Sequence, residues 1–264
     1  MELAAGLAKV HIFDSASELA SSAAHRAGTL ITGAIDNFGC ARVMAATGNS
    51  QVQFIAALVN LPGVNWNRVE LFHMDEYVGL SPKHPASFRL WIKTRLVDKV
   101  HPARAHYLAA DAPDLDAETQ RYSELLLAAQ IHLAFVGFGE NGHIAFNDPH
   151  VADFSDPATV RRVALDEACR RQQLGEGHFP DLDSVPSEAL TVTCPGLFRA
   201  ASWICCVPDS RKAQAVRNAL EGPISPLCPA SLVRQHPNAS VYLDGQSASL
   251  LEAVSAGVRP LEHF

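Results

Sequence analysis

The stretch CARVMAATGNSQVQFIAALVN, residues 40–60, indicates the fold class. Its first part, CARVMAA (40–46), is an apolar run typical of a short buried strand. The polar TGNS (47–50) ends that run, and QVQFIAALVN (51–60) then has the apolar spacing of a helix. A buried strand that leads through a short loop into a helix is the repeating unit of α/β proteins.

The same alternation continues along the chain. Further strands are expected at 68–74, 131–138, 159–165, 188–193, 201–208 and 240–244. Further helices are expected at 15–39, with Ser15 or Ser17 as N-cap and Gly39 as its stop, and at 86–100, 114–130, 166–174, 210–222 and 229–237. No repeat or linker interrupts this pattern. We therefore predict one α/β domain over 1–264, a mostly parallel sheet with helices on both faces.

Composition excludes several classes of protein. The 264 residues are 48% hydrophobic, which is enough for a full core. The 28 acidic and 21 basic residues give a net charge of −7, which argues against a general nucleic-acid binder but allows an anionic ligand at a local positive site. No apolar run reaches the about 18 residues of a membrane span, and the N-terminus lacks signal-peptide features. We expect a cytoplasmic protein without a nucleic-acid or membrane partner.

The cysteines and histidines show no metal-binding spacing. None of the six cysteines forms a CxxC pair, and several lie in apolar segments such as ASWICCVP (201–208). They are expected to be small buried side chains in a reducing compartment. The twelve histidines are scattered and no HExxH motif is present. We predict no protein-bound metal.

Polar residues follow three of the predicted strands, at the ends where parallel sheets bind their ligands. In LFHMDEYVGL (71–80), an apolar strand ends in Asp75 and Glu76. Burying a carboxylate without a partner is costly, so acids at this position indicate a cleft. A solvated turn, or a cap for the next helix, explains them equally well.

The loop VGFGENGHIAFNDP (136–149) contains a literal G-x-G-x-x-G. The nicotinamide-binding fingerprint needs a helix directly after its glycines, and the prolines that follow here argue against one. The glycines are better explained as a loop that presents His143. Asn141 and Asp148 flank this histidine, and a nearby carboxylate can orient an imidazole for proton transfer. For the other histidines a structural role is expected.

Two segments have the features of a phosphate site. In TGNS (47–50), small residues before a helix allow backbone N–H groups to approach an anion, although Ser50 could act only as an N-cap. In PDSRKAQAV (208–216), Ser210 is expected to cap a helix with Lys212 in its first turn. An anionic ligand would explain a lysine there, and a solvated surface lysine is the alternative. Together these segments predict a phosphorylated small molecule that undergoes proton transfers.

The sequence resembles the glucosamine-6-phosphate deaminase (isomerase) family. The matching segments are HMDEYVGL (73–80), HPASF (84–88), GFGENGHIAFNDP (137–149), VPSEALTV (185–192), SRKAQAV (210–216) and HPNASVYLD (236–244). They span most of the chain in family order. The resemblance implies a single Rossmann-like domain, conversion of glucosamine 6-phosphate to fructose 6-phosphate and ammonia, and no metal or organic cofactor.

The resemblance also implies roles for individual residues. Asp75 corresponds to the carboxylate that moves a proton between C2 and C1 of the opened sugar. His143 corresponds to the group that opens the pyranose ring, supported by Asn141 and Asp148. Glu76 is a candidate substrate-binding residue that we expect just behind the side chains that touch the sugar.

The phosphate positions of the family correspond to Gly48, Asn49, Ser50 and Lys212. Here the family's TG-(G/S)-TP loop is TGNSQ, so the Asn49 side chain either narrows the phosphate site or adds a bond of its own. Position 148 is Asp where the family usually has Glu, one methylene longer, which leaves its reach to His143 open.

One family arginine has no match at its aligned place near Gly177. Arg170 or Arg171 on the preceding helix is the expected substitute, and Arg171 is our candidate substrate-binding residue. The segment 150–185 is a candidate active-site lid that Gly175 and Gly177 could hinge.

Other functions remain open at this point. They are a deaminase or isomerase for another sugar phosphate, a 6-phosphogluconolactonase, and a sugar-phosphate sensor without catalysis. The sequence also leaves open whether copies of the chain associate.

Overall fold

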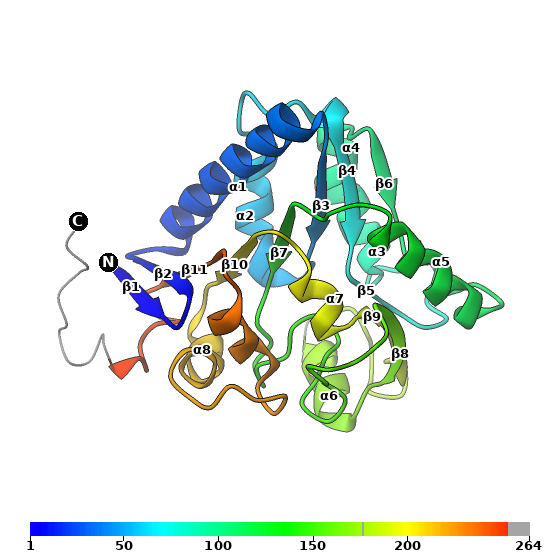
Figure 1. Cartoon of the computed structure of the whole chain (residues 1–264). Coiled ribbons are helices and arrows are strands. Elements are labelled where there is room, and N and C mark those ends of the chain that lie inside the picture. Colours follow the sequence, from blue (N-terminus) through cyan, green and yellow to red (C-terminus); the bar gives the residue numbers. More distant parts are fainter. Residues whose placement is uncertain (176, 253–264) are drawn as a thin grey trace.

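The computed structural model describes residues 1–175 and 177–252, and Figure 1 shows its arrangement. An eight-stranded sheet has the order β1-β2-β11-β10-β7-β3-β4-β6. In chain order its strands are β1 Glu2–Ala5, β2 Ala8–Phe13, β3 Ala41–Ala45, β4 Val69–His73, β6 Arg104–His106, β7 Leu133–Val136, β10 Trp203–Val207 and β11 Ala239–Asp244. Apart from the antiparallel β1–β2 pair, its neighbouring strands are parallel. The predicted mostly parallel sheet is confirmed.

Helices cover both faces of this sheet, as predicted. They are α1 Ala16–Phe38, α2 Val52–Val59, α3 Phe88–Ile92, which continues through a π-helical turn Lys93–Val97 into α4 Asp98–Val100, α5 Leu115–Leu127, α7 Cys194–Phe198 and α8 Ala213–Leu220. Consecutive strand residues point to opposite faces. Val43 and Leu71 pack with α1 and α2, whereas Met44 and Phe72 pack in a second core with residues of α5 and α8.

The end signals of the first helix act as expected. The Ser15 side chain accepts a hydrogen bond from the Glu18 backbone N–H at 3.2 Å. Gly39 ends the helix with φ 77°, a left-handed conformation that glycine adopts without steric cost. Its N–H donates to the carbonyl of Ile35, so the last turn is closed.

A second, three-stranded antiparallel sheet was not expected. It has the order β5-β9-β8, with β5 Asp75–Tyr77, β8 Val160–Ala164 and β9 Glu188–Val192. The strands predicted at 159–165 and 188–193 therefore exist but belong to this small sheet. Helix α6, Glu167–Gly175, lies beside it, and a third apolar core around Tyr77, Phe146 and Phe179 packs the layer together.

The sequence missed the β1–β2 hairpin, β6 and the short α7. The segment predicted as a helix at 229–237 is a 3₁₀ helix, Pro229–Gln235. Within the part of the chain that the structure describes, no helix is long and apolar enough to cross a membrane.

Candidate active site

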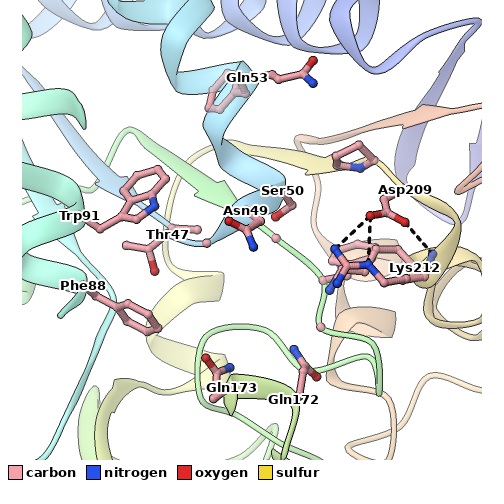
Figure 2. Close-up of a pocket in the computed structure, with 18 of the residues that line it drawn as sticks. Thr47, Asn49, Ser50, Gln53, Phe88, Trp91, Gln172, Gln173, Asp209 and Lys212 are labelled. Carbon is pink, nitrogen blue, oxygen red and sulfur yellow. Dashed lines mark hydrogen bonds and ion pairs between the residues drawn. The ribbon is translucent and has the colours of Figure 1, made fainter. Parts of the chain in front are cut away.

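A cavity of about 540 Å³ opens at the carboxyl ends of the parallel strands. Its walls include the segments that follow β3 (46–50), β4 (74–77), β7 (137–146) and β10 (208–212). Residues of α3 and α6 complete it, and Figure 2 shows its lining. The structure therefore brings the three strand ends singled out in the sequence together with the predicted phosphate segment after β10. Asp14 after β2 and Asp244 at the end of β11 also line the cavity.

Asp75 lies in the cavity wall and is 6% exposed. Its Oδ1 has no hydrogen-bond partner among the described residues. Burial, and secondarily the nearby Glu76 carboxylate, raise the pKa of Asp75 well above its usual value. This carboxyl group is therefore more basic than an exposed one, and proton transfer requires a group of that kind.

Glu76 points away from the cavity, because successive side chains of a strand face opposite sides. It accepts hydrogen bonds from the Ser87 hydroxyl at 2.8 Å and from the backbone N–H groups of Phe88 and Arg89 at 3.1 and 2.9 Å. Burial raises its pKa, although these hydrogen bonds act in the opposite direction. The structure thus does not place Glu76 with the substrate-binding residues. It holds the first turn of α3 beside Asp75.

His143 enters the cavity from the loop after β7 and is 9% exposed. Its Nδ1 lies 3.1 Å from Asp148 Oδ1, so the shorter side chain does reach the imidazole. Asn141 donates to the same oxygen at 2.7 Å and accepts the His143 backbone N–H at 3.0 Å. Burial alone would raise the pKa of Asp148, but the charge of the nearby His143 and the hydrogen bond from Asn141 lower it to about 2. Asp148 is therefore an ionised orienting group.

Glycines shape the loop that holds His143. A Cβ on Gly139 would lie 2.2 Å from His143 Cε1, so the imidazole packs directly on the glycine backbone. Gly142 has φ 84°, and a Cβ there would lie 2.7 Å from Cys228 Sγ. The chain continues after these glycines without a helix, so the loop lacks the helix that dinucleotide binding requires.

The predicted phosphate residues all line the cavity. Figure 2 shows Asn49 and Ser50 near Lys212 and Asp209. Gly48 has φ 96°, which allows the sharp turn into the 3₁₀ helix Asn49–Gln51 ahead of α2. Gln51 donates its side-chain amide to Ser50 Oγ at 3.0 Å, and Lys212 is 9% exposed.

The predicted cap of the last phosphate segment is wrong. Asp209, not Ser210, precedes the 3₁₀ turn Ser210–Lys212, and its carboxylate accepts the Arg211 backbone N–H at 2.9 Å. A carboxylate has two acceptor oxygens, and here Oδ1 accepts the Arg211 backbone N–H while Oδ2 accepts the Arg211 Nε–H. Asp209 has φ 87°, and the turn starts directly after it. Lys212 therefore lies in the 3₁₀ turn before α8 rather than in the helix.

Neither candidate lid arginine lines the cavity. The Arg171 side chain is 65% exposed and pairs with Glu167 one turn earlier in α6. Arg170 donates to the backbone carbonyls of Val185 and Leu182. The next two residues of α6, Gln172 and Gln173, line the cavity instead. Successive side chains of a helix point in different directions, so these two face the cavity although Arg170 and Arg171 do not.

Sequence reasoning also missed Trp91, Phe88 and Arg211, which line the cavity. The adjacency of Arg211 to Lys212 was the available signal. Within residues 1–175 and 177–252, no group of three or more His, Cys, Asp or Glu side chains could hold a metal ion.

The fold and the cavity together define an α/β protein whose parallel strands end at a cavity lined by a buried carboxyl, an imidazole and two cationic side chains. The family model described as glucosamine-6-phosphate isomerases/6-phosphogluconolactonase matches residues 14–242, and the chain belongs to this family.

Similar proteins agree with this assignment. A glucosamine-6-phosphate deaminase of an Exiguobacterium species is 35% identical over 205 residues, 77% of this chain and 78% of the relative. The structure of a monomeric glucosamine-6-phosphate deaminase has a TM-score of 0.83 at 30% identity and covers 91% of this chain and 99% of that one. A 6-phosphogluconolactonase from Thermotoga maritima shares the fold. Its TM-score is 0.72 at 18% identity, and the match covers 89% of this chain and 98% of that one.

Proposed function

We propose that the protein is a glucosamine-6-phosphate deaminase, which converts glucosamine 6-phosphate and water to fructose 6-phosphate and ammonia. One observation carries the proposal: the buried Asp75 carboxyl, His143 and Lys212 line one cavity, and the buried Asp148 lies 3.1 Å from His143 Nδ1. A deaminase needs a carbon-acid base, a ring-opening group and a phosphate anchor. The names of the similar deaminases support the same substrate.

In this proposal Asp75 moves the proton between C2 and C1 of the opened sugar. Its raised pKa suits a base that removes a proton from carbon near neutral pH. A positioned acid–base group typically contributes on the order of 10²–10⁴ in rate. The loss of the amino group then requires water at C2, which leaves the ketone and ammonia.

His143 opens the pyranose ring in the same scheme. Asp148 and Asn141 orient its imidazole through Nδ1 and the backbone, which leaves Nε2 as the atom for proton transfer. The residues Gly48, Asn49, Ser50 and Lys212 bind the phosphate, since they combine backbone N–H groups with a largely buried ammonium.

The test is to incubate the pure protein with glucosamine 6-phosphate and to assay ammonia and fructose 6-phosphate. We expect equal release of both, lost in Asp75→Asn while substrate binding persists. Unchanged turnover in Asp75→Asn would remove Asp75 as the base. Hydrolysis of 6-phosphogluconolactone without ammonia release would favour the lactonase, and binding without turnover would favour a sensor or another hexosamine phosphate.

A cytoplasmic location and a lid function for 150–185 remain predictions of this proposal. The similar protein described as monomeric makes a monomer our expectation for this chain as well. Light scattering behind size-exclusion chromatography measures the assembly directly.

A further inference from the structure

Two permanently positive side chains line the cavity in the described part of the chain, Lys212 and Arg211. They are adjacent in sequence and lie in the turn that follows β10. The arginines expected at this site from the sequence lie elsewhere: Arg171 pairs with Glu167 at the surface, and Arg170 binds backbone carbonyls of its own segment.

Carboxylates on two loops hold the Arg211 guanidinium at the cavity. Its Nε and Nη2 lie 3.1 and 3.0 Å from Asp209 Oδ2, and its Nη1 lies 3.7 Å from Glu140 Oε1. Glu140 belongs to the same loop as His143. The guanidinium therefore connects the turn of Lys212 with the loop of the acid–base pair.

The backbone conformation of Asp209, the residue that Arg211 contacts, is unusual. A non-glycine residue with φ 87° is strained, and such strain tends to persist at functional sites. The Asp209 N–H donates to Asp244 Oδ2 at 3.1 Å, which fixes the backbone in place. Hydrogen bonds from Arg211, first from its backbone and then from its side chain, lower the pKa of Asp209. Asp209 is therefore an anion that Arg211 contacts through both its backbone N–H and its guanidinium.

We infer that Arg211 is a second binding cation for the substrate phosphate, in the place of a lid arginine. This inference rests on the proposed sugar-phosphate ligand. A guanidinium presents five N–H donors in a planar fork, so it can contact phosphate oxygens while it remains beside a carboxylate. Both cationic side chains that bind the phosphate, Arg211 and Lys212, thus come from the turn after β10. Binding of the phosphate then does not require a charged side chain from α6.

The test compares single variants by calorimetric binding of glucose 6-phosphate, which needs no turnover. Arg211→Ala should weaken binding roughly tenfold or more, the usual effect of losing a charge-assisted contact. Arg217→Ala is the matched control, because this arginine lies on α8, is similarly exposed and pairs with Glu221 outside the cavity. It should bind as the unmodified protein does, and so should Arg171→Ala.

Two further variants separate the role in binding from damage to the turn. Arg211→Lys keeps the charge and should recover part of the affinity. In Arg211→Ala the Asp209 carboxylate keeps its negative charge without the guanidinium beside it. Adding Asp209→Asn removes that charge and should also recover part of the affinity, since asparagine tolerates positive φ. With glucosamine 6-phosphate as substrate, Arg211→Ala should raise KM much more than it lowers kcat.

Unchanged binding in Arg211→Ala, or a larger loss in Arg171→Ala, would overturn the inference. So would an equal loss of affinity for glucose and glucose 6-phosphate. A failure of the proposed function looks different: no hexosamine phosphate is turned over, yet glucose 6-phosphate or inorganic phosphate still binds in an Arg211-dependent way.

Discussion

Gly139 matters for the proposed chemistry because its missing side chain leaves room for the His143 imidazole. The His143 ring fills the volume that a Cβ would occupy, at 2.2 Å from Cε1. Gly139→Ala should therefore push the imidazole away from Asp148 and lower kcat about 10²-fold, because misplaced acid–base groups lose most of their effect. Steady-state kinetics measures this change.

Gly33→Ala is the control for that variant. Apart from the backbone of α1 around it, no atom lies within 4 Å of a Cβ at Gly33, so alanine should leave kcat unchanged and stabilise the helix by about 0.5–1 kcal/mol. If Gly139→Ala retained full activity, the packing of His143 on this glycine would have no catalytic importance.

Asp75 gives a pH-dependent prediction about stability. Its pKa is raised in the folded protein, so its contribution to the free energy of unfolding is fully present below the unfolded value near 3.8 and is lost as pH rises through the folded pKa. Asparagine resembles the neutral acid at every pH. Asp75→Asn should therefore raise the Tm at pH 7 and leave it nearly unchanged at pH 3.

Thermal unfolding at both pH values tests this expectation, with the exposed Asp183→Asn as control. Equal shifts of Tm at pH 7 and pH 3 would contradict it. A stabilised but inactive Asp75→Asn would mean that the active site keeps a buried acid at the expense of stability, a common trade between stability and function.

The sequence could predict the site residues that belong to recognisable motifs, but not the others. Asp75, His143 and Lys212 lie next to strand ends, and parallel strands bring such ends to one edge. Arg170 and Arg171 could not be told from Gln172 and Gln173, because each helical residue points about 100° from the one before it. The sequence also could not reveal that Asp209 would replace Ser210 as the cap.

At the scale of elements, a buried hydrogen bond links α6 to the small sheet beside the cavity. The Tyr77 hydroxyl of β5 donates to Gln173 Oε1, and Gln173 lines the cavity. Tyr77→Phe leaves a buried carbonyl oxygen without this donor, which should cost about 1–3 kcal/mol and loosen α6. Hydrogen exchange of residues 167–175 should become faster, and KM should rise.

The same measurement can contradict this role. If exchange in 167–175 stayed as slow as in the unmodified protein while exchange in α1 was also unchanged, the contact would not hold α6. A change in α1 as well would indicate general destabilisation instead.

Elements with a continuous apolar pattern could be predicted, and short or mixed ones could not. The strand at 41–45 is buried on both faces, so its composition reveals it. The three residues of β6 and the half-exposed β1 lack such a pattern. The residues of β8 and β9 predicted extended structure, but periodicity does not tell which sheet a strand joins.

At the scale of the whole molecule, the cavity lies between the large parallel sheet and the small antiparallel layer, so a ligand contacts both. A ligand that binds only the folded state at about 100 times its Kd stabilises it by about 2.7 kcal/mol. For a chain of this size, that is roughly 5–10 °C in Tm. We expect such a rise with glucose 6-phosphate and much less with glucose. Lys212→Ala should abolish the difference between the two sugars, and a difference that persisted would place the phosphate away from Lys212.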